Sequence, residues 1–101
     1  MQIGDNVSVG HGSMLHGCKI ENNVIIGMNS AVLNGSEISN DSIVGANVLI
    51  SEGKKFPEKS LIIGVPGRIK RELEQVEIES IAKNAAEYVE LINDYSKINK
   101  K

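Results

Sequence analysis

The 101-residue chain is poor in aromatic residues and cysteine, and these shortages argue against some classes of function before any motif is considered. It has no Trp, one Phe, two Tyr and one Cys. So few aromatic rings leave no platform on which nucleic acid bases could stack, and eleven basic residues are outnumbered by thirteen acidic ones. We therefore expect no nucleic acid partner. The lone Cys18 cannot form an internal disulfide, which is usual in a reducing compartment.

Long apolar runs are also missing from the chain. No stretch approaches the roughly 20 consecutive apolar residues that a membrane-spanning helix needs, so we expect no membrane segment. The first residues, MQIGDN, show neither a basic leader nor the apolar core of a signal peptide, and the expected location is cytoplasmic. A content of 41% apolar and 24% charged residues, with a formal charge of -2, is typical of one globular domain.

Glycine and proline are confined to the first two thirds of the chain. All ten glycines lie at or before Gly67, and the 34 residues from 68 to 101 contain neither Gly nor Pro, which indicates a change of architecture. In the first part, large apolar residues recur every six positions, with a single step of five. The series is Ile3, Val9, Leu15, Ile20, Ile26, Val32, Ile38, Val44, Ile50, Phe56 and Ile62.

A period of six fits neither the 3.6 residues per turn of a helix nor the alternation of a hairpin strand. It predicts a short strand and a corner that repeat around a solenoid, in which three sides make one coil and successive coils stack into three parallel sheets. Asn, Asp and Gly between the apolar positions tolerate the positive φ of tight corners. We therefore predict a β-helix of about three coils over residues 1–63. The core of some other β fold is the alternative.

The rest of the chain is expected to leave the solenoid and form a helix. Residues 64–72 begin with the turn-forming GVPGR and are predicted to be a connecting turn. Over residues 73–98, apolar residues recur at spacings of three to five between Glu and Lys, which indicates an amphipathic C-terminal α-helix. This helix could cover a sheet of its own solenoid or one of a neighbouring molecule. The predicted fold is mainly β, in one domain.

The run from Val9 to Cys18, VGHGSMLHGC, contains both histidines of the chain, His11 and His16. Imidazole suits divalent transition metals, so the pair are candidate metal ligands; packing at an interface is the alternative. In the hexapeptide register they fall on different sides of a corner and point outward, so one chain could not easily chelate an ion with both. Cys18 is a conceivable third ligand, although its apolar neighbourhood favours a buried, inert thiol.

The run from Ile3 to about Leu73 resembles the C-terminal two-thirds of γ-class carbonic anhydrase-like proteins of the hexapeptide-repeat superfamily. VGHGSMLHGC and IGMNSAVLNG are the discriminating segments, whereas GVPGR also resembles turns of hexapeptide acyltransferases. The resemblance implies a left-handed β-helix and a homotrimer with zinc, or alternatively iron or cobalt, at its subunit interfaces. It further implies that each ion is held by two histidines of one subunit and one of its neighbour, of which His11 and His16 match two.

The activity that the resemblance implies is reversible, metal-dependent hydration of carbon dioxide to bicarbonate. The family's third histidine would lie about one coil before Val9 and is not in this sequence, so we expect weak or lost activity. Tyr88 and Asn34 are candidate catalytic residues, for which packing and a role at a corner are the respective alternatives. Two other function classes stay open: a hexapeptide-repeat acyltransferase and a non-catalytic trimeric binding module.

Overall fold

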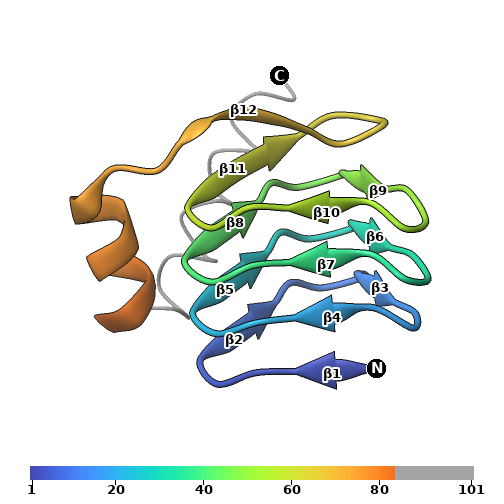
Figure 1. Ribbon diagram of the computed structural model, residues 1–101, viewed down its shortest axis with the longest axis horizontal. Helices are drawn as coiled ribbons and strands as arrows, with labels where there is room; N and C mark the ends of the chain where they lie inside the picture. The colour runs from blue at the N-terminus through green and yellow to red at the C-terminus, as the bar shows by residue number, and fades with distance from the viewer. Residues whose placement is uncertain (84–101) are drawn as a thin grey trace.

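The computed structural model describes residues 1–83 and shows a parallel β-solenoid with a helix against one side (Figure 1). The chain passes through three short strands in each coil, and equivalent strands of successive coils pair in parallel. The prediction of a mainly β solenoid of about three coils, followed by a C-terminal helix, is confirmed.

Three sheets form the sides of the solenoid. The first sheet contains β1 (Gln2–Ile3), β4 (Lys19–Ile20), β7 (Glu37–Ile38) and β10 (Lys55–Phe56). The second sheet contains β2 (Val7–Val9), β5 (Val24–Ile26), β8 (Ser42–Val44), β11 (Ser60–Ile63) and β12 (Arg68–Glu72). The third sheet contains β3 (Met14–Leu15), β6 (Ala31–Val32) and β9 (Leu49–Ile50). Strand β12 pairs antiparallel with β11 and lies within residues 64–72, where the sequence predicts only a connecting turn.

The first coil is one residue shorter than the next. Val7 lies opposite Val24, 17 positions on, whereas Val24 lies opposite Ser42, 18 positions on (24 − 7 and 42 − 24). The missing residue corresponds to the single step of five between Leu15 and Ile20 and falls in the corner after β3. This shortening becomes important at the candidate site.

The interior takes large apolar side chains and small serines. One continuous cluster of buried residues fills it: Cys18, Ile20, Val24, Ile26, Val32, Ile38, Val44, Val48, Ile50, Phe56 and Ile62. The serines that are also buried satisfy their hydroxyl groups on nearby carbonyls, as a dry interior requires. Ser30 donates to the carbonyl of Gly45 at 2.7 Å, and Ser60 donates to that of Pro57 at 2.7 Å.

The corner before each of the four parallel strands of the second sheet, β2, β5, β8 and β11, uses a residue with positive φ. The four residues are Asn6, Asn23, Asp41 and Lys59, with φ of 59°, 60°, 62° and 61°. The Asn6 side-chain amide donates to Asn23 Oδ1 at 2.7 Å, and the Asn23 amide donates to Asp41 Oδ1 at 2.8 Å. Asn and Asp tolerate this conformation better than other non-glycine residues, so the corners are encoded as the sequence suggested.

The helix begins at residue 75 and is described to residue 83. Ile78 and Ile81 on the helix, together with Leu73 before it, form a second buried cluster with Ile25 and Ile43 of β5 and β8. The helix therefore covers a sheet of its own solenoid (Figure 1). The remainder of the helix expected over 73–98, including Tyr88, lies outside the described residues. The helical segment that is described lacks the length and apolar character to cross a membrane.

A salt bridge secures the start of this helix. The Arg71 guanidinium donates to both carboxylate oxygens of Glu77 at 2.8 Å, and the Glu74 backbone N–H donates to Glu77 Oε1 at 2.8 Å. These charge-assisted bonds to Arg71 lower the pKa of Glu77 to about 2. The carboxylate thus caps the first turn of the helix and ties it to β12.

Candidate functional site

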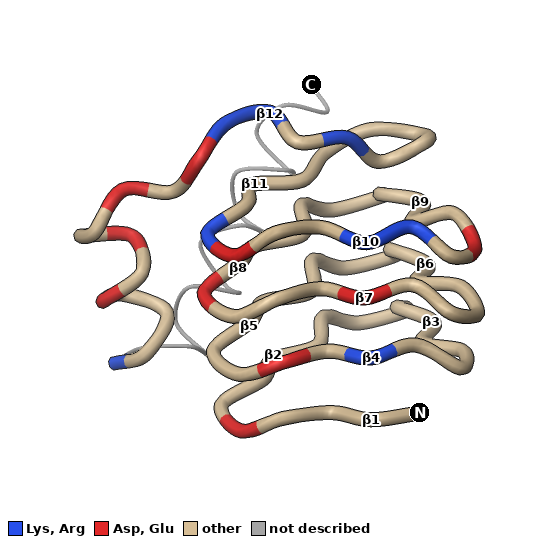
Figure 2. The backbone as a smooth tube through the Cα atoms, viewed as in Figure 1, with Lys and Arg blue, Asp and Glu red and all other residues tan. Residues whose placement is uncertain are grey.

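The outer surface of the first sheet is polar. The outward residues of its successive strands are Gln2, Lys19, Glu37 and Lys55, and the charged positions run along β4, β7 and β10 in Figure 2. Lys55 Nζ lies 3.5 Å from Glu37 Oε2. This row is suited to contact with water.

The outward residues of the second sheet are apolar after the first coil. The row reads Ser8, Ile25, Ile43 and Leu61. Ile25 and Ile43 are buried by the helix, and Leu61 is partly buried beside the same cluster. The helix and Leu73 therefore cover this apolar row within the chain itself.

The third sheet carries an apolar outer row that no helix or strand within residues 1–83 covers. The residues are Met14, Ala31 and Leu49, and we call this surface the open face. Met14 is 61% exposed, and Ala31 and Leu49 are half-buried. This row was not predicted, although its signal is present in the sequence: in each coil, the residue before the interior position of the third side is apolar.

The two histidines lie at opposite ends of β3, beside the open face. His11 is in the turn between β2 and β3, where its carbonyl accepts a hydrogen bond from the Asn29 N–H at 2.9 Å. His16 directly follows β3, and its N–H donates to the carbonyl of Val32 at 3.0 Å. Both histidines are exposed, as expected for residues that point outward.

The His16 ring has a partner in the next coil. His16 Nδ1 lies 3.1 Å from Asn34 Oδ1. Gly17, the residue after His16, has a φ of +62°, and a Cβ there would collide with the Asn34 side chain. Asn34 is thus brought to one of the candidate ligands.

One chain does not assemble a metal site from its described part. Among residues 1–83, no three His, Cys, Asp or Glu side chains are grouped so that they could hold an ion. Cys18 is 3% exposed in the solenoid core, its Sγ lies 3.7 Å from Met1 Sδ, and burial raises the pKa of its thiol. A protonated, buried thiol is a poor ligand, which favours the inert interpretation.

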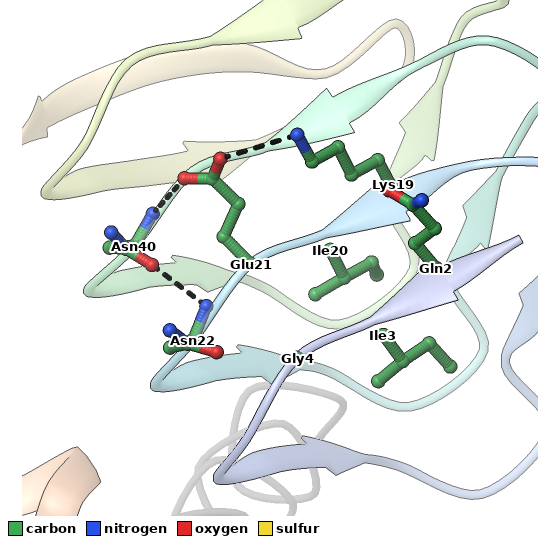
Figure 3. A pocket seen from close by; sticks show the side chains of 8 residues that line it. All are labelled: Gln2, Ile3, Gly4, Lys19, Ile20, Glu21, Asn22 and Asn40. Carbon is green, nitrogen blue, oxygen red and sulfur yellow. Dashed lines mark hydrogen bonds and ion pairs between the residues drawn. The ribbon is translucent and has the colours of Figure 1, made fainter.

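A shallow hollow of about 280 Å³ opens on the first sheet at the end of the solenoid where the chain starts (Figure 3). Its polar groups already bind one another: Glu21 lies 3.8 Å from Lys19 Nζ and accepts from the Asn40 N–H at 3.2 Å, while Asn40 Oδ1 accepts from the Asn22 N–H at 2.8 Å. Neither histidine lines this hollow. It offers no group of residues that suggests catalysis.

Comparison with known proteins agrees with the six-residue repeat. The family described as bacterial transferase hexapeptide (six repeats) matches residues 17–52. The "Probable carbonic anhydrase" of Methanocaldococcus jannaschii is 67% identical over 89 residues, which cover 88% of this chain and 56% of that protein. The chain is a γ-carbonic anhydrase-like hexapeptide-repeat protein.

Proteins similar to this γ-carbonic anhydrase-like chain include carbonic anhydrases and acetyltransferases. "Gamma carbonic anhydrase 2, mitochondrial" of Arabidopsis thaliana is 32% identical, over 98% of this chain and 36% of that protein. A hexapeptide-repeat acetyltransferase of Vibrio cholerae, solved with acetyl coenzyme A, has a TM-score of 0.67 and 27% identity, over 72% of this chain and 49% of that one. The chain spans about half or less of the length of each relative.

Proposed function

We propose that the chain takes part in metal-dependent, reversible hydration of carbon dioxide to bicarbonate, at the interfaces of a cytoplasmic homotrimer that is formed through the open face. The observation that carries this proposal is the position of His11 and His16 at the two ends of β3, beside an apolar row that no described helix or strand covers. The 67% identity to a protein named as a probable carbonic anhydrase supports the same reaction.

The donor set fits a divalent transition metal. Two exposed imidazoles are suitable for zinc, or alternatively for iron or cobalt. Catalytic zinc normally has three protein ligands and an open position, and the described part of one chain offers two candidates. Each ion would therefore take His11 from one copy of the chain and His16 from another, with a further donor from elsewhere in the assembly or from water.

The chain's own residues would bind the metal ion and shield its site from bulk water. When bound, the ion supplies the acidity that makes a water molecule nucleophilic near neutral pH. Met14, Ala31 and Leu49 would pack against a second copy and keep bulk water from that side of the site. His16 would present its ring from the end of β3, where the backbone bond to Val32 anchors it.

A complementation experiment tests the shared site. The chain is purified with zinc, its mass is measured in solution, and its metal content is determined beside those of His11→Ala and His16→Ala. We expect about one ion per chain in the wild type, as closed symmetry with equivalent interfaces requires, and strong loss in each variant. When the two variants are co-expressed, each mixed trimer has an interface that joins an intact His11 to an intact His16, so part of the zinc returns.

Two results would contradict the proposal. A metal-free trimer would favour the non-catalytic binding module, and mixed trimers that recover no zinc would show that the two histidines do not share an ion across chains. Hydration of carbon dioxide is then followed by stopped flow in the zinc-loaded wild type. A rate above the buffer background that His16→Ala abolishes is the expected result.

The acetyltransferase of Vibrio cholerae provides a second candidate function, because its structure, solved with acetyl coenzyme A, shares this fold at 27% identity. Acetyl coenzyme A binding, measured by calorimetry, separates the two. A micromolar dissociation constant that both histidine variants retain would favour an acyltransferase.

A further inference from the structure

We infer that Asn34 is a positioning residue for His16: it holds the proton on Nδ1 of the His16 ring and leaves the Nε2 lone pair free for a metal ion. This inference rests on the proposed function, because it assigns a purpose to His16 as a ligand.

The short first coil brings the two side chains together. Leu15 lies opposite Val32 in the third sheet, so His16 and Gly17 follow β3 where Leu33 and Asn34 follow β6. The His16 Nδ1 then lies 3.1 Å from Asn34 Oδ1. Since the first coil lacks one residue in this corner, the turn comes directly after His16, at Gly17.

Backbone hydrogen bonds hold Asn34 in place on both sides. The Gly53 N–H donates to the carbonyl of Asn34 at 2.9 Å, and the N–H of the following residue, Gly35, donates to the carbonyl of Gly17 at 2.9 Å. The corner that carries Asn34 is therefore tied to the coil before it and to the coil after it. Because its backbone is fixed in this way, Asn34 can hold the exposed His16 ring in one orientation.

Gly17 is the residue that makes this contact possible. At a φ of +62° a side chain is strained, and a Cβ would lie 2.9 Å from Asn34 Cγ. Any other residue at this position would push the Asn34 carboxamide away from the ring. The segment HGC after β3 therefore encodes both a candidate ligand and the space for its partner.

The chemistry of the pair decides the tautomer. A neutral imidazole carries one N–H and one acceptor nitrogen, and an amide oxygen only accepts hydrogen bonds. Nδ1 must therefore carry the proton when it faces Asn34 Oδ1, which leaves Nε2 as the atom able to bind a metal. Histidine ligands in metal sites almost always have such a partner, and its loss weakens metal affinity by about 10 to 100-fold.

The first test uses the full chain without metal, at mildly alkaline pH. Long-range proton–nitrogen correlation spectra report which nitrogen of each histidine is protonated, and His16→Ala assigns the signals. We expect the wild type and Asn34→Asp, which keeps an acceptor, to hold the proton on Nδ1 of His16. Asn34→Leu should shift the ring toward the Nε2–H form that free histidine prefers.

Glu52→Leu is the matched control, because Glu52 stands at the same corner one coil further along and is exposed. It should leave the His16 spectrum unchanged. Circular dichroism shows whether either leucine variant has lost its fold. If both stay folded and the tautomer changes only in Asn34→Leu, the change is due to the lost contact with His16. A wild type whose His16 carries its proton on Nε2, or an Asn34→Leu spectrum identical to wild type, overturns the inference.

The second test measures zinc affinity by competition with a coloured chelator. Asn34→Leu should bind zinc about 10 to 100-fold more weakly than wild type, whereas Asn34→Asp and Glu52→Leu should lose no more than a few-fold. Equal affinity in wild type and Asn34→Leu overturns the inference alone. A wild type that binds no zinc overturns the proposed function, and the spectra then still decide whether Asn34 fixes the tautomer.

Discussion

Replacement of Leu49 by Asp should separate the copies of the chain without unfolding the solenoid. Leu49 is half-buried on the open face, and its backbone is already paired: its N–H donates to the carbonyl of Gly64 at 3.2 Å, and its carbonyl accepts from the Gly67 N–H at 2.7 Å. In a monomer, the new carboxylate can point into water. In the proposed trimer it would be placed in an apolar interface, where even a neutral polar group without a partner costs about 1 to 3 kcal/mol and a carboxylate costs more, so this range is a lower bound.

The symmetry of the assembly multiplies this penalty. Three copies of the substitution would weaken association by about 3 to 9 kcal/mol in total, and each 1.4 kcal/mol corresponds to about a tenfold change in the equilibrium constant. Sedimentation velocity over a range of concentrations should therefore show monomer for Leu49→Asp where the wild type is trimeric. Circular dichroism should show the same β content for both.

The polar first sheet provides the control for this experiment. Lys19 has the equivalent outward position in β4 and is exposed, so Lys19→Asp introduces the same carboxylate on a surface that faces water. This variant should stay trimeric. The reasoning is refuted if Leu49→Asp and wild type sediment alike, because the open face would then not be the interface.

Three further predictions concern stability and the site. Ile43→Ala should cost about 2 to 5 kcal/mol in urea unfolding, because Ile43 is 3% exposed between the helix and the solenoid; a cost below about 1 kcal/mol would mean that the helix does not pack there. The pKa of Glu77 falls from 4.5 to about 2 on folding, so its carboxylate stabilises the fold fully above about pH 4.5. This contribution, about 1 kcal/mol for an ion pair near the surface, is lost as the pH falls toward 2. In urea titrations over this pH range, the stability of Glu77→Gln should lack this part of the acid dependence. Gly17→Ala should lower stability by about 1 to 2 kcal/mol and release the His16 ring from Asn34, so a spectrum of His16 identical to wild type would contradict the role assigned to Gly17.

The solenoid could be predicted from the sequence because its six-residue spacing of apolar residues is visible without knowledge of any distant contact. From Ile20 to Ile62, each apolar residue at a spacing of six fills the same place in the interior. The single step of five reappears as a first coil one residue shorter than the next. Strand β12 was not predicted, because RIKRE has no place in the six-residue period and its pairing depends on β11. The position of the helix was also undetermined, since either the row at Ile25 and Ile43 or a neighbouring molecule could have received it.

The candidate site is less visible in the sequence, because it depends on contacts between coils. The spacing of His11 and His16 indicates outward ligands, but it does not show that Asn34 reaches the His16 ring. That contact requires two alignments at once: the short first coil, which sets His16 and Gly17 over the corner of the second, and a glycine that leaves room for a carboxamide. The open face similarly becomes meaningful only after the helix is seen to cover a different sheet.

An ion shared between two copies would couple metal binding to assembly. If His11 and His16 reach the same ion from different chains, the separated chain has a much lower affinity for zinc than the trimer, and zinc must stabilise the trimer by the same free energy. Leu49→Asp should then bind zinc weakly although both histidines are intact, and a chelator should shift the wild type toward monomer. A site contained within one chain would show neither effect, so this reciprocity distinguishes a shared metal centre from a trimer that merely has histidines at its interface.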